Sequence, residues 1–287
     1  LGAIPENGVL RLGVLEGPGS TARSTVRVYV GEEVVAAVET LGNSDWLDIR
    51  IPLGAYANAP ANPTIFIEGR GDHWVGPLKV FTPKTSLPNV LVFVVDSLRK
   101  DHLGCYGYGR DTSPNIDAFA EEAYRFTRCI ASSSWTRPAV ASLLSGVYPN
   151  RHGGQGDRHV LRSGIPWLPN LLSSEGYTCE ALVATPDVLP VWGFGPGFAR
   201  FVDANVLLHH QAPASHDTFV DEAVTMLTLL EGLPWFFYVH ARGAQAPYAP
   251  PAAYLARVYP PTLPSELEAQ RKVEMIAKYD GAIAYAD

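Results

Sequence analysis

The chain has 287 residues, of which 47% are hydrophobic and 18% are charged. This composition is typical of a folded globular protein and excludes a disordered chain, and the length suffices for a large core and more than one structural unit. The formal net charge of −7, with no run of lysine or arginine, argues against nucleic acid as the main partner. No stretch approaches the roughly 18 consecutive apolar residues that a membrane span needs.

The first 85 residues have the pattern of β-strands. Apolar and polar residues alternate over residues 25–30 and again over residues 47–51, and short apolar runs are separated by clusters of Gly, Pro and Asn. We predict that residues 1–85 form a small β-sandwich-like accessory domain. A packing role is the favoured interpretation, and a sugar-binding or substrate-gating role is the alternative. Residues 82–88 are the expected linker to a second domain, residues 86–287.

The second domain begins with the apolar run at residues 90–95, which predicts a parallel strand covered on both faces. Apolar periodicity, capping residues and terminal glycines predict the further elements. The expected helices are residues 113–123, 138–145, 168–174 and 217–230, and the expected strands are residues 178–184 and 235–240. Alternating strands and helices predict an α/β fold, with a mainly parallel sheet and helices on both faces. The chain stops at Asp287 inside an apparent helix, so we expect a C-terminally truncated fragment.

Ligands of such sheets bind beyond the carboxyl ends of the strands, where Asp96, Thr185 and the residues after Val239 are expected. Thr136 precedes the helix predicted at residues 138–145. Free amide protons and the helix dipole favour a bound phosphate or sulfate at a helix N-terminus. An acid at a strand end and a hydroxyl at a helix start can together hold a metal ion and a nucleophile over an anionic ester.

Six blocks of sequence resemble the sulfatase branch of the alkaline phosphatase superfamily, in the order that the family has them. They are NVLVFVVDSLRKDHLGCYGYGRDTSPNIDAFAEEA, SSSWTRPAVASLLSGVYPNRHG, LPNLLSSEGYTCEALVA, GFGPGFARFVD, PWFFYVHARGAQAPYAPP and YDGAIAYAD. The resemblance covers residues 89–287. It implies an alkaline phosphatase-like fold and suggests an extracytoplasmic location, either periplasmic or secreted.

The resemblance also implies roles for individual residues. Asp96 takes the position of a metal ligand, and Thr136 takes the position of the nucleophile. Sulfatases proper have Cys or Ser there, matured to formylglycine, within a Cys-x-Pro-Ser-Arg pattern whose arginine is Val140 in this chain. The second aspartate of the family's first strand is Ser97 here, which we retain as a candidate metal ligand. The histidine of the family's Asp-Pro-His motif is Gln245.

Three residues are the candidate substrate-binding residues: Arg137, His240 and Gln245. Arg137 follows the nucleophile position, with a surface location as the alternative. Asp101 and His102 resemble a metal-binding pair, but we expect a structural role for both. His152 is expected to order its loop.

The types of the candidate ligands favour a hard divalent cation at the predicted site. Asp96 and Thr136 offer oxygen ligands, which suit Ca²⁺, Mg²⁺ or Mn²⁺, while Zn²⁺ is possible if histidines complete the site. Threonine cannot expel sulfate by restoring an aldehyde, so phosphate-type esters are favoured over sulfate. The hypothesis is a metal-dependent hydrolase of an anionic ester, with a glycan or a lipid as the candidate carrier of the ester. The alternatives are a pseudoenzyme retained for binding and a transferase of a phospho-headgroup.

Overall fold

The computed structural model describes most of the chain. The described residues are 4–6, 8–16, 24–39, 46–57, 63–69, 73–75, 79–81, 87–156, 158–205, 216–230 and 232–287. The predicted linker, residues 82–88, lies mostly outside this part, and so does the expected domain boundary between residues 85 and 86. The division into two domains therefore stays a prediction.

The N-terminal strands form two small antiparallel sheets. The strands are β1 Val9–Glu16, β2 Thr25–Val30, β3 Glu33–Glu39, β4 Trp46–Pro52, β5 Pro63–Glu68, β6 His73–Val75 and β7 Lys79–Phe81. β1 pairs with β4, β6 and β7 in one sheet, and β2 pairs with β3 and β5 in the other. Alternate residues of both sheets, such as Leu12 and Val28, share one buried core. This arrangement confirms the sandwich-like N-terminal part predicted from the alternation.

The second part of the chain has a parallel sheet in the order β10-β9-β11-β8. Its strands are β8 Val90–Val95, β9 Thr178–Val183, β10 Arg200–Asp203 and β11 Trp235–Ala241. The helices are α1 Pro114–Glu121, α2 Thr136–Ser145, α3 Pro149–His152, α4 Leu168–Ser174, α6 His216–Leu229, α7 Ala252–Val258 and α8 Leu267–Ala286. The α/β fold is confirmed, and the predicted elements agree with these bounds within about two residues at each end.

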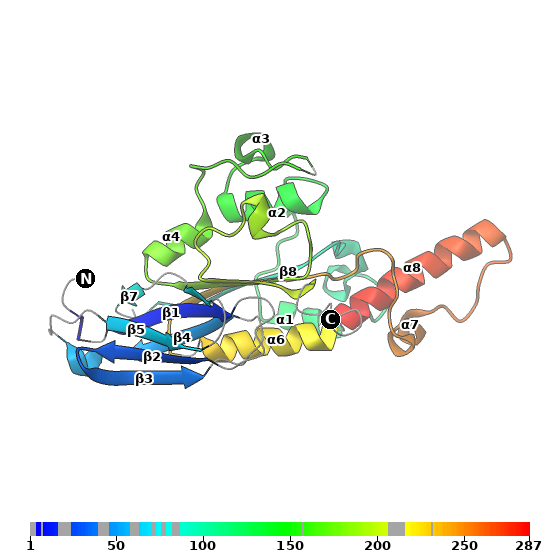
Figure 1. The fold of residues 1–287 in the computed structure, drawn as a ribbon. Coiled ribbons are helices and arrows are strands. Elements are labelled where there is room, and N and C mark those ends of the chain that lie inside the picture. Colours follow the sequence, from blue (N-terminus) through cyan, green and yellow to red (C-terminus); the bar gives the residue numbers. More distant parts are fainter. Residues whose placement is uncertain are drawn as a thin grey trace.

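Helices cover both faces of this sheet. Figure 1 shows α2, α3 and α4 on one side and α6 on the other, where the N-terminal strands also lie. Residues of α2 and α4 pack with one set of alternate strand residues, including Ala181 and Tyr238. Residues of α6 pack with the other set, including Leu182 and Phe237. The functional residues described below lie on the first of these faces.

One expectation about the sheet is wrong. The apolar run of β8 predicted a strand covered on both faces, but Leu91 and Phe93 are 49% and 52% exposed. The reason is that β8 stands at the edge of the described sheet. Its residues on the α6 side therefore extend beyond the apolar cluster that α6 covers.

A buried ion pair joins the N-terminal strands to the parallel sheet. Glu180 on β9 is fully buried, and its Oε1 lies 2.9 Å from Nη2 of Arg11 on β1 and 3.5 Å from Nη2 of Arg50 on β4.

In the part of the chain that the structure describes, no helix has both the length and the apolar composition of a membrane span.

Candidate active site

The carboxyl ends of β8 and β11 bring the first candidate residues together. In the parallel register, Val95 lies beside Ala241, and the amide of Asp96 donates to the carbonyl oxygen of Ala241 at 3.1 Å. Asp96 thus leaves the sheet directly beside the end of the strand that carries His240. Thr185 follows the neighbouring strand β9 and is buried. The expectation that these residues share one edge is correct.

Thr136 is the first residue of α2, and its side chain reaches the edge of the sheet at which Asp96 lies. Its hydroxyl donates to Oδ2 of Asp96 at 3.0 Å, with Oδ1 at 3.4 Å. The helix begins two residues earlier than predicted, so Trp135 occupies the N-cap position and Pro138 is the third helical residue. Gly146 ends the helix in the left-handed conformation, as predicted. A hydroxyl at the start of α2 therefore meets a carboxylate at the end of β8.

The Asp96 carboxylate is contacted by three groups. The backbone amide of Ser97 donates to Oδ1 at 2.8 Å, Thr136 donates to Oδ2, and Nε2 of His240 lies 3.5 Å from Oδ2. Burial opposes ionisation of this carboxyl, but His240, Thr136 and the amide of Ser97 favour the charged form and outweigh burial. The net effect lowers the pKa of Asp96 below its ordinary value. Asp96 is therefore an ionised acceptor at neutral pH.

His240 is completely buried on β11, and its other ring nitrogen has a partner. The hydroxyl of Tyr238 lies 2.8 Å from Nδ1 of His240. Tyr238 and His240 are two residues apart on one strand, so their side chains point to the same face of the sheet. Sequence reasoning missed Tyr238, although this spacing was a signal that could have found it.

The backbone at this edge has an unusual conformation at Ser97 and Gly243. Ser97 has φ +58°, which is the left-handed region that side chains rarely adopt. Gly243 also has φ +58°, and a Cβ at this position would lie 2.6 Å from the carbonyl oxygen of Asp96. The aspartate of the family's Asp-Pro-His motif therefore cannot replace Gly243 without moving the end of β8. Gln245 lies two residues further along, half-buried, and its substrate-binding role stays a prediction.

Arg137 is buried, so the surface location considered for it is wrong. Only 3% of its surface is exposed, and its guanidinium donates to the carbonyl oxygens of Asp187 and Gly156 and to the carboxylate of Asp187. The cation also stacks 4.0 Å above the ring centroid of Trp192. These contacts tie the start of α2 to the loop after β9. The substrate-binding role of Arg137 stays a prediction.

The two histidines expected to be structural have structural contacts. Nδ1 of His102 lies 2.6 Å from the buried carboxylate of Asp280, while Asp101 pairs with Arg99 near the surface. His152 is fully buried, and its Nδ1 accepts from the amide of Gly154 at 3.1 Å.

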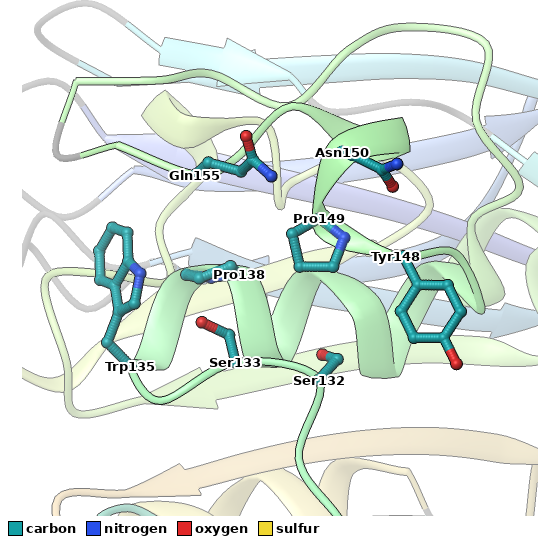
Figure 2. A pocket seen from close by; sticks show the side chains of 8 residues that line it. All are labelled: Ser132, Ser133, Trp135, Pro138, Tyr148, Pro149, Asn150 and Gln155. Carbon is teal, nitrogen blue, oxygen red and sulfur yellow. The ribbon is translucent and has the colours of Figure 1, made fainter.

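A pocket of about 540 Å³ runs along α2 and is lined there by Trp135 and Pro138. Figure 2 shows the side chains around it, with Trp135 at one end and Tyr148 at the other. Its lining is uncharged and combines aromatic, hydroxyl and amide groups: Ser132, Ser133, Trp135, Pro138, Tyr148, Pro149, Asn150 and Gln155.

The residues at this edge suit a hard cation better than zinc. Asp96 and Thr136 place carboxylate and hydroxyl oxygens within 3.0 Å of each other, and such donors are the ligands that Ca²⁺, Mg²⁺ and Mn²⁺ prefer. In the described part of the chain, no three His, Cys, Asp or Glu residues gather as a metal-binding group. Asp96 and Thr136 offer two oxygen donors of this kind, and their role as metal ligands stays a prediction.

A sequence profile of one family, described as "Sulfatase", matches residues 88–287. The chain belongs to the sulfatase family. Human arylsulfatase A is 39% identical over 181 residues, which are 54% of this chain and 36% of that protein. The chain thus spans about a third of the length of this sulfatase, and equally short or shorter parts of the other sulfatases.

Two solved structures share the fold of this chain. The Zn complex of the C-terminal periplasmic domain of EcEptC from Escherichia coli has a TM-score of 0.54 at 20% identity, over 71% of this chain and 58% of that one. The phosphonate monoester hydrolase of Agrobacterium radiobacter has a TM-score of 0.54 at 19% identity, over 69% and 57% of the two chains. The fold is therefore that of the alkaline phosphatase superfamily, as the resemblance implied.

Proposed function

We propose that this protein is a metal-dependent hydrolase of sulfate or phosphate esters, with Thr136 as the nucleophile and Asp96 as a metal ligand. The observation that carries the proposal is the 3.0 Å contact between the Thr136 hydroxyl and the Asp96 carboxylate. The contact joins a helix start and a strand end in a chain of the sulfatase family. It supports the two roles that the sequence resemblance implies.

The position of Thr136 suits attack on an anion. Amide groups in the first turn of a helix have no partner within the helix, and together with the helix dipole they attract negatively charged oxygens. A divalent cation bound by Asp96 would lower the pKa of the hydroxyl and neutralise charge on the ester oxygens. The hydroxyl oxygen of Thr136 would form a bond to phosphorus or sulfur as the bond to the leaving oxygen breaks, and the proton that the hydroxyl loses would balance the one that the leaving oxygen takes up. In a second step a water oxygen would bond to phosphorus or sulfur, the bond to Thr136 would break, and a proton of the water would restore the hydroxyl.

Phosphate-type esters suit this nucleophile best. A threonine ester has no route back to an aldehyde, so water must attack phosphorus or sulfur directly. Water attack on phosphorus in a metal site is established chemistry for phosphoryl transfer. The fold that the chain shares with a phosphonate monoester hydrolase is compatible with this preference. We include a location outside the cytoplasm in the proposal, since one related structure is a periplasmic domain.

The pocket beside Trp135 suits the alcohol part of the ester. Its uncharged lining of aromatic rings, hydroxyls and amides can stack on a sugar ring and hydrogen-bond its hydroxyl groups (Figure 2). A glycan is therefore the favoured carrier of the ester, ahead of a lipid.

The deciding experiment measures turnover of aryl sulfate, phosphate monoester and phosphodiester substrates by the full-length protein with Mn²⁺, Ca²⁺ or Zn²⁺. Thr136→Val removes the hydroxyl while keeping the side-chain shape, and we expect it to lower turnover by about 10³-fold or more. Thr136→Ser keeps a hydroxyl and should retain part of the activity. Thr225→Val is the matched control, because Thr225 lies exposed on α6 and bonds the Asp221 carbonyl oxygen.

The outcomes separate the proposal from a binding-only protein. Metal-dependent turnover that Thr136→Val abolishes and Thr225→Val leaves intact supports an enzyme and identifies its ester class. Turnover that persists in Thr136→Val contradicts the nucleophile assignment. No turnover of any ester, together with no binding of the metal ions, favours a pseudoenzyme.

A further inference from the structure

A buried row of polar side chains leads to Asp96, the residue that contacts the candidate nucleophile. It runs from the Tyr238 hydroxyl to Nδ1 of His240 at 2.8 Å, and from Nε2 of His240 towards Oδ2 of Asp96 at 3.5 Å. Tyr238 and His240 are both 0% exposed. No residue role assigned above uses the Tyr238 hydroxyl.

The hydroxyl of Tyr238 is a polar group on a side chain that packs among apolar residues. The Tyr238 ring belongs to an apolar cluster that includes Phe236 and Ala181 on neighbouring positions of the sheet. A phenylalanine could fill the same space, and a buried hydroxyl costs free energy unless it is hydrogen-bonded. Its hydrogen-bond partner is the ring nitrogen of His240. The hydroxyl is therefore explained by what it does to His240 and not by packing.

The neighbours of His240 decide which of its nitrogens carries the proton. A neutral imidazole has one N–H donor and one acceptor nitrogen. Nε2 faces the carboxylate of Asp96, which only accepts hydrogen bonds, so the proton belongs on Nε2. Nδ1 is then the acceptor, and the Tyr238 hydroxyl is its donor. In the described part of the chain Nε2 has no hydrogen-bond partner, and Oδ2 of Asp96 lies 3.5 Å from it.

We propose that Tyr238 is a positioning residue, which holds His240 in the tautomer protonated at Nε2 and thereby fixes the orientation of the Asp96 carboxylate. The amide of Ser97 donates to Oδ1, and Nε2 of His240 lies on the side of Oδ2, 3.5 Å away. A carboxylate held from both sides presents its remaining lone pairs in one direction. Partners of this kind orient metal ligands in proteins, so the inference rests on the proposed role of Asp96.

Nitrogen NMR of the 287-residue chain labelled with ¹⁵N-histidine tests this tautomer at one neutral pH. The chain has eight histidines, and His240→Gln identifies the signals of His240 by their loss. In the wild-type chain we expect His240 as a single tautomer with the proton on Nε2. In Tyr238→Phe, which keeps the ring and removes the hydroxyl, we expect a mixture of both tautomers.

Tyr106→Phe is the matched control, because it removes a hydroxyl that bonds the Phe126 carbonyl oxygen and should leave the His240 signals unchanged. A wild-type His240 protonated on Nδ1, or on both nitrogens, overturns the inference. So does a Tyr238→Phe spectrum in which the tautomer is unchanged. The measurement needs neither metal nor turnover, so its failure is distinguishable from failure of the proposed hydrolase activity.

Discussion

Glu180 should be the residue whose charge holds the N-terminal strands against the parallel sheet. Its side chain is 1% exposed, and the side chains of Arg11 and Arg50 are 10% and 14% exposed. Glu180→Gln keeps the size of the side chain but removes the negative charge that lies against two poorly hydrated guanidinium groups. Removing one partner of a buried ion pair costs about 3–5 kcal/mol. Because glutamine still accepts one hydrogen bond, we expect a loss of about 3 kcal/mol in the free energy of unfolding.

Urea unfolding followed by circular dichroism and tryptophan fluorescence measures this loss. At a slope of about 3 kcal/mol per molar urea, the midpoint should fall by about 1 M. The matched control is Glu68→Gln, since Glu68 pairs with Arg27 at the surface of the N-terminal sheets, with 71% and 38% of the two side chains exposed. An exposed pair contributes about 0–1 kcal/mol, so the control should change little.

A double-mutant cycle then isolates the pair. Arg11→Met combined with Glu180→Gln should be less destabilising than the two single changes added together, with a coupling of about 1 kcal/mol or more. The reasoning is refuted if Glu180→Gln matches the Glu68→Gln control, or if the two changes add within about 0.5 kcal/mol. Either result would mean that the charge of Glu180 does not stabilise the contact between the two parts.

Three further predictions concern buried groups elsewhere in the chain. Asp280→Asn should lower the free energy of unfolding by about 3 kcal/mol, because Asp280 is fully buried with an arginine, a histidine and a tyrosine as partners. In the same urea titration, the change Asp101→Asn at the surface should cost less than about 1 kcal/mol. Burial lowers the pKa of His152 below 6.5, so as pH falls through 6.5 the unfolded chain binds a proton first and stability declines, by at most about 1.4 kcal/mol per pH unit. The difference in stability between wild type and His152→Gln should therefore shrink between pH 7.5 and 5.5, and parallel pH curves would contradict this. Gly243→Ala should cost about 2 kcal/mol more than Gly176→Ala by thermal unfolding, since both have positive φ but only at Gly243 would a Cβ meet backbone within 2.6 Å; equal losses would argue against the close contact.

Local patterns predicted most of the fold. The alternation in residues 25–30 and the apolar run in β8 each marked a strand, and the glycine after Ser145 marked the end of a helix. These features depend on residues close in the chain, so the sequence reveals them directly. The exposure of Leu91 and Phe93 could not be predicted in this way, because it depends on which strand stands at the edge of the sheet.

The same distinction between local patterns and tertiary contacts applies to the candidate site. The chain's own residues indicated Asp96 and Thr136, since a strand end and a helix start are local features, and the family resemblance gave their roles. Tertiary structure alone brought the two side chains to 3.0 Å, turned Arg137 inward onto Asp187, and placed Tyr238 behind His240. These contacts join residues that lie on different elements or depend on the packing of a whole face, and no local periodicity encodes such distances. The sequence therefore determined which groups could act, and the packing of α2 against the parallel sheet decided which of them meet.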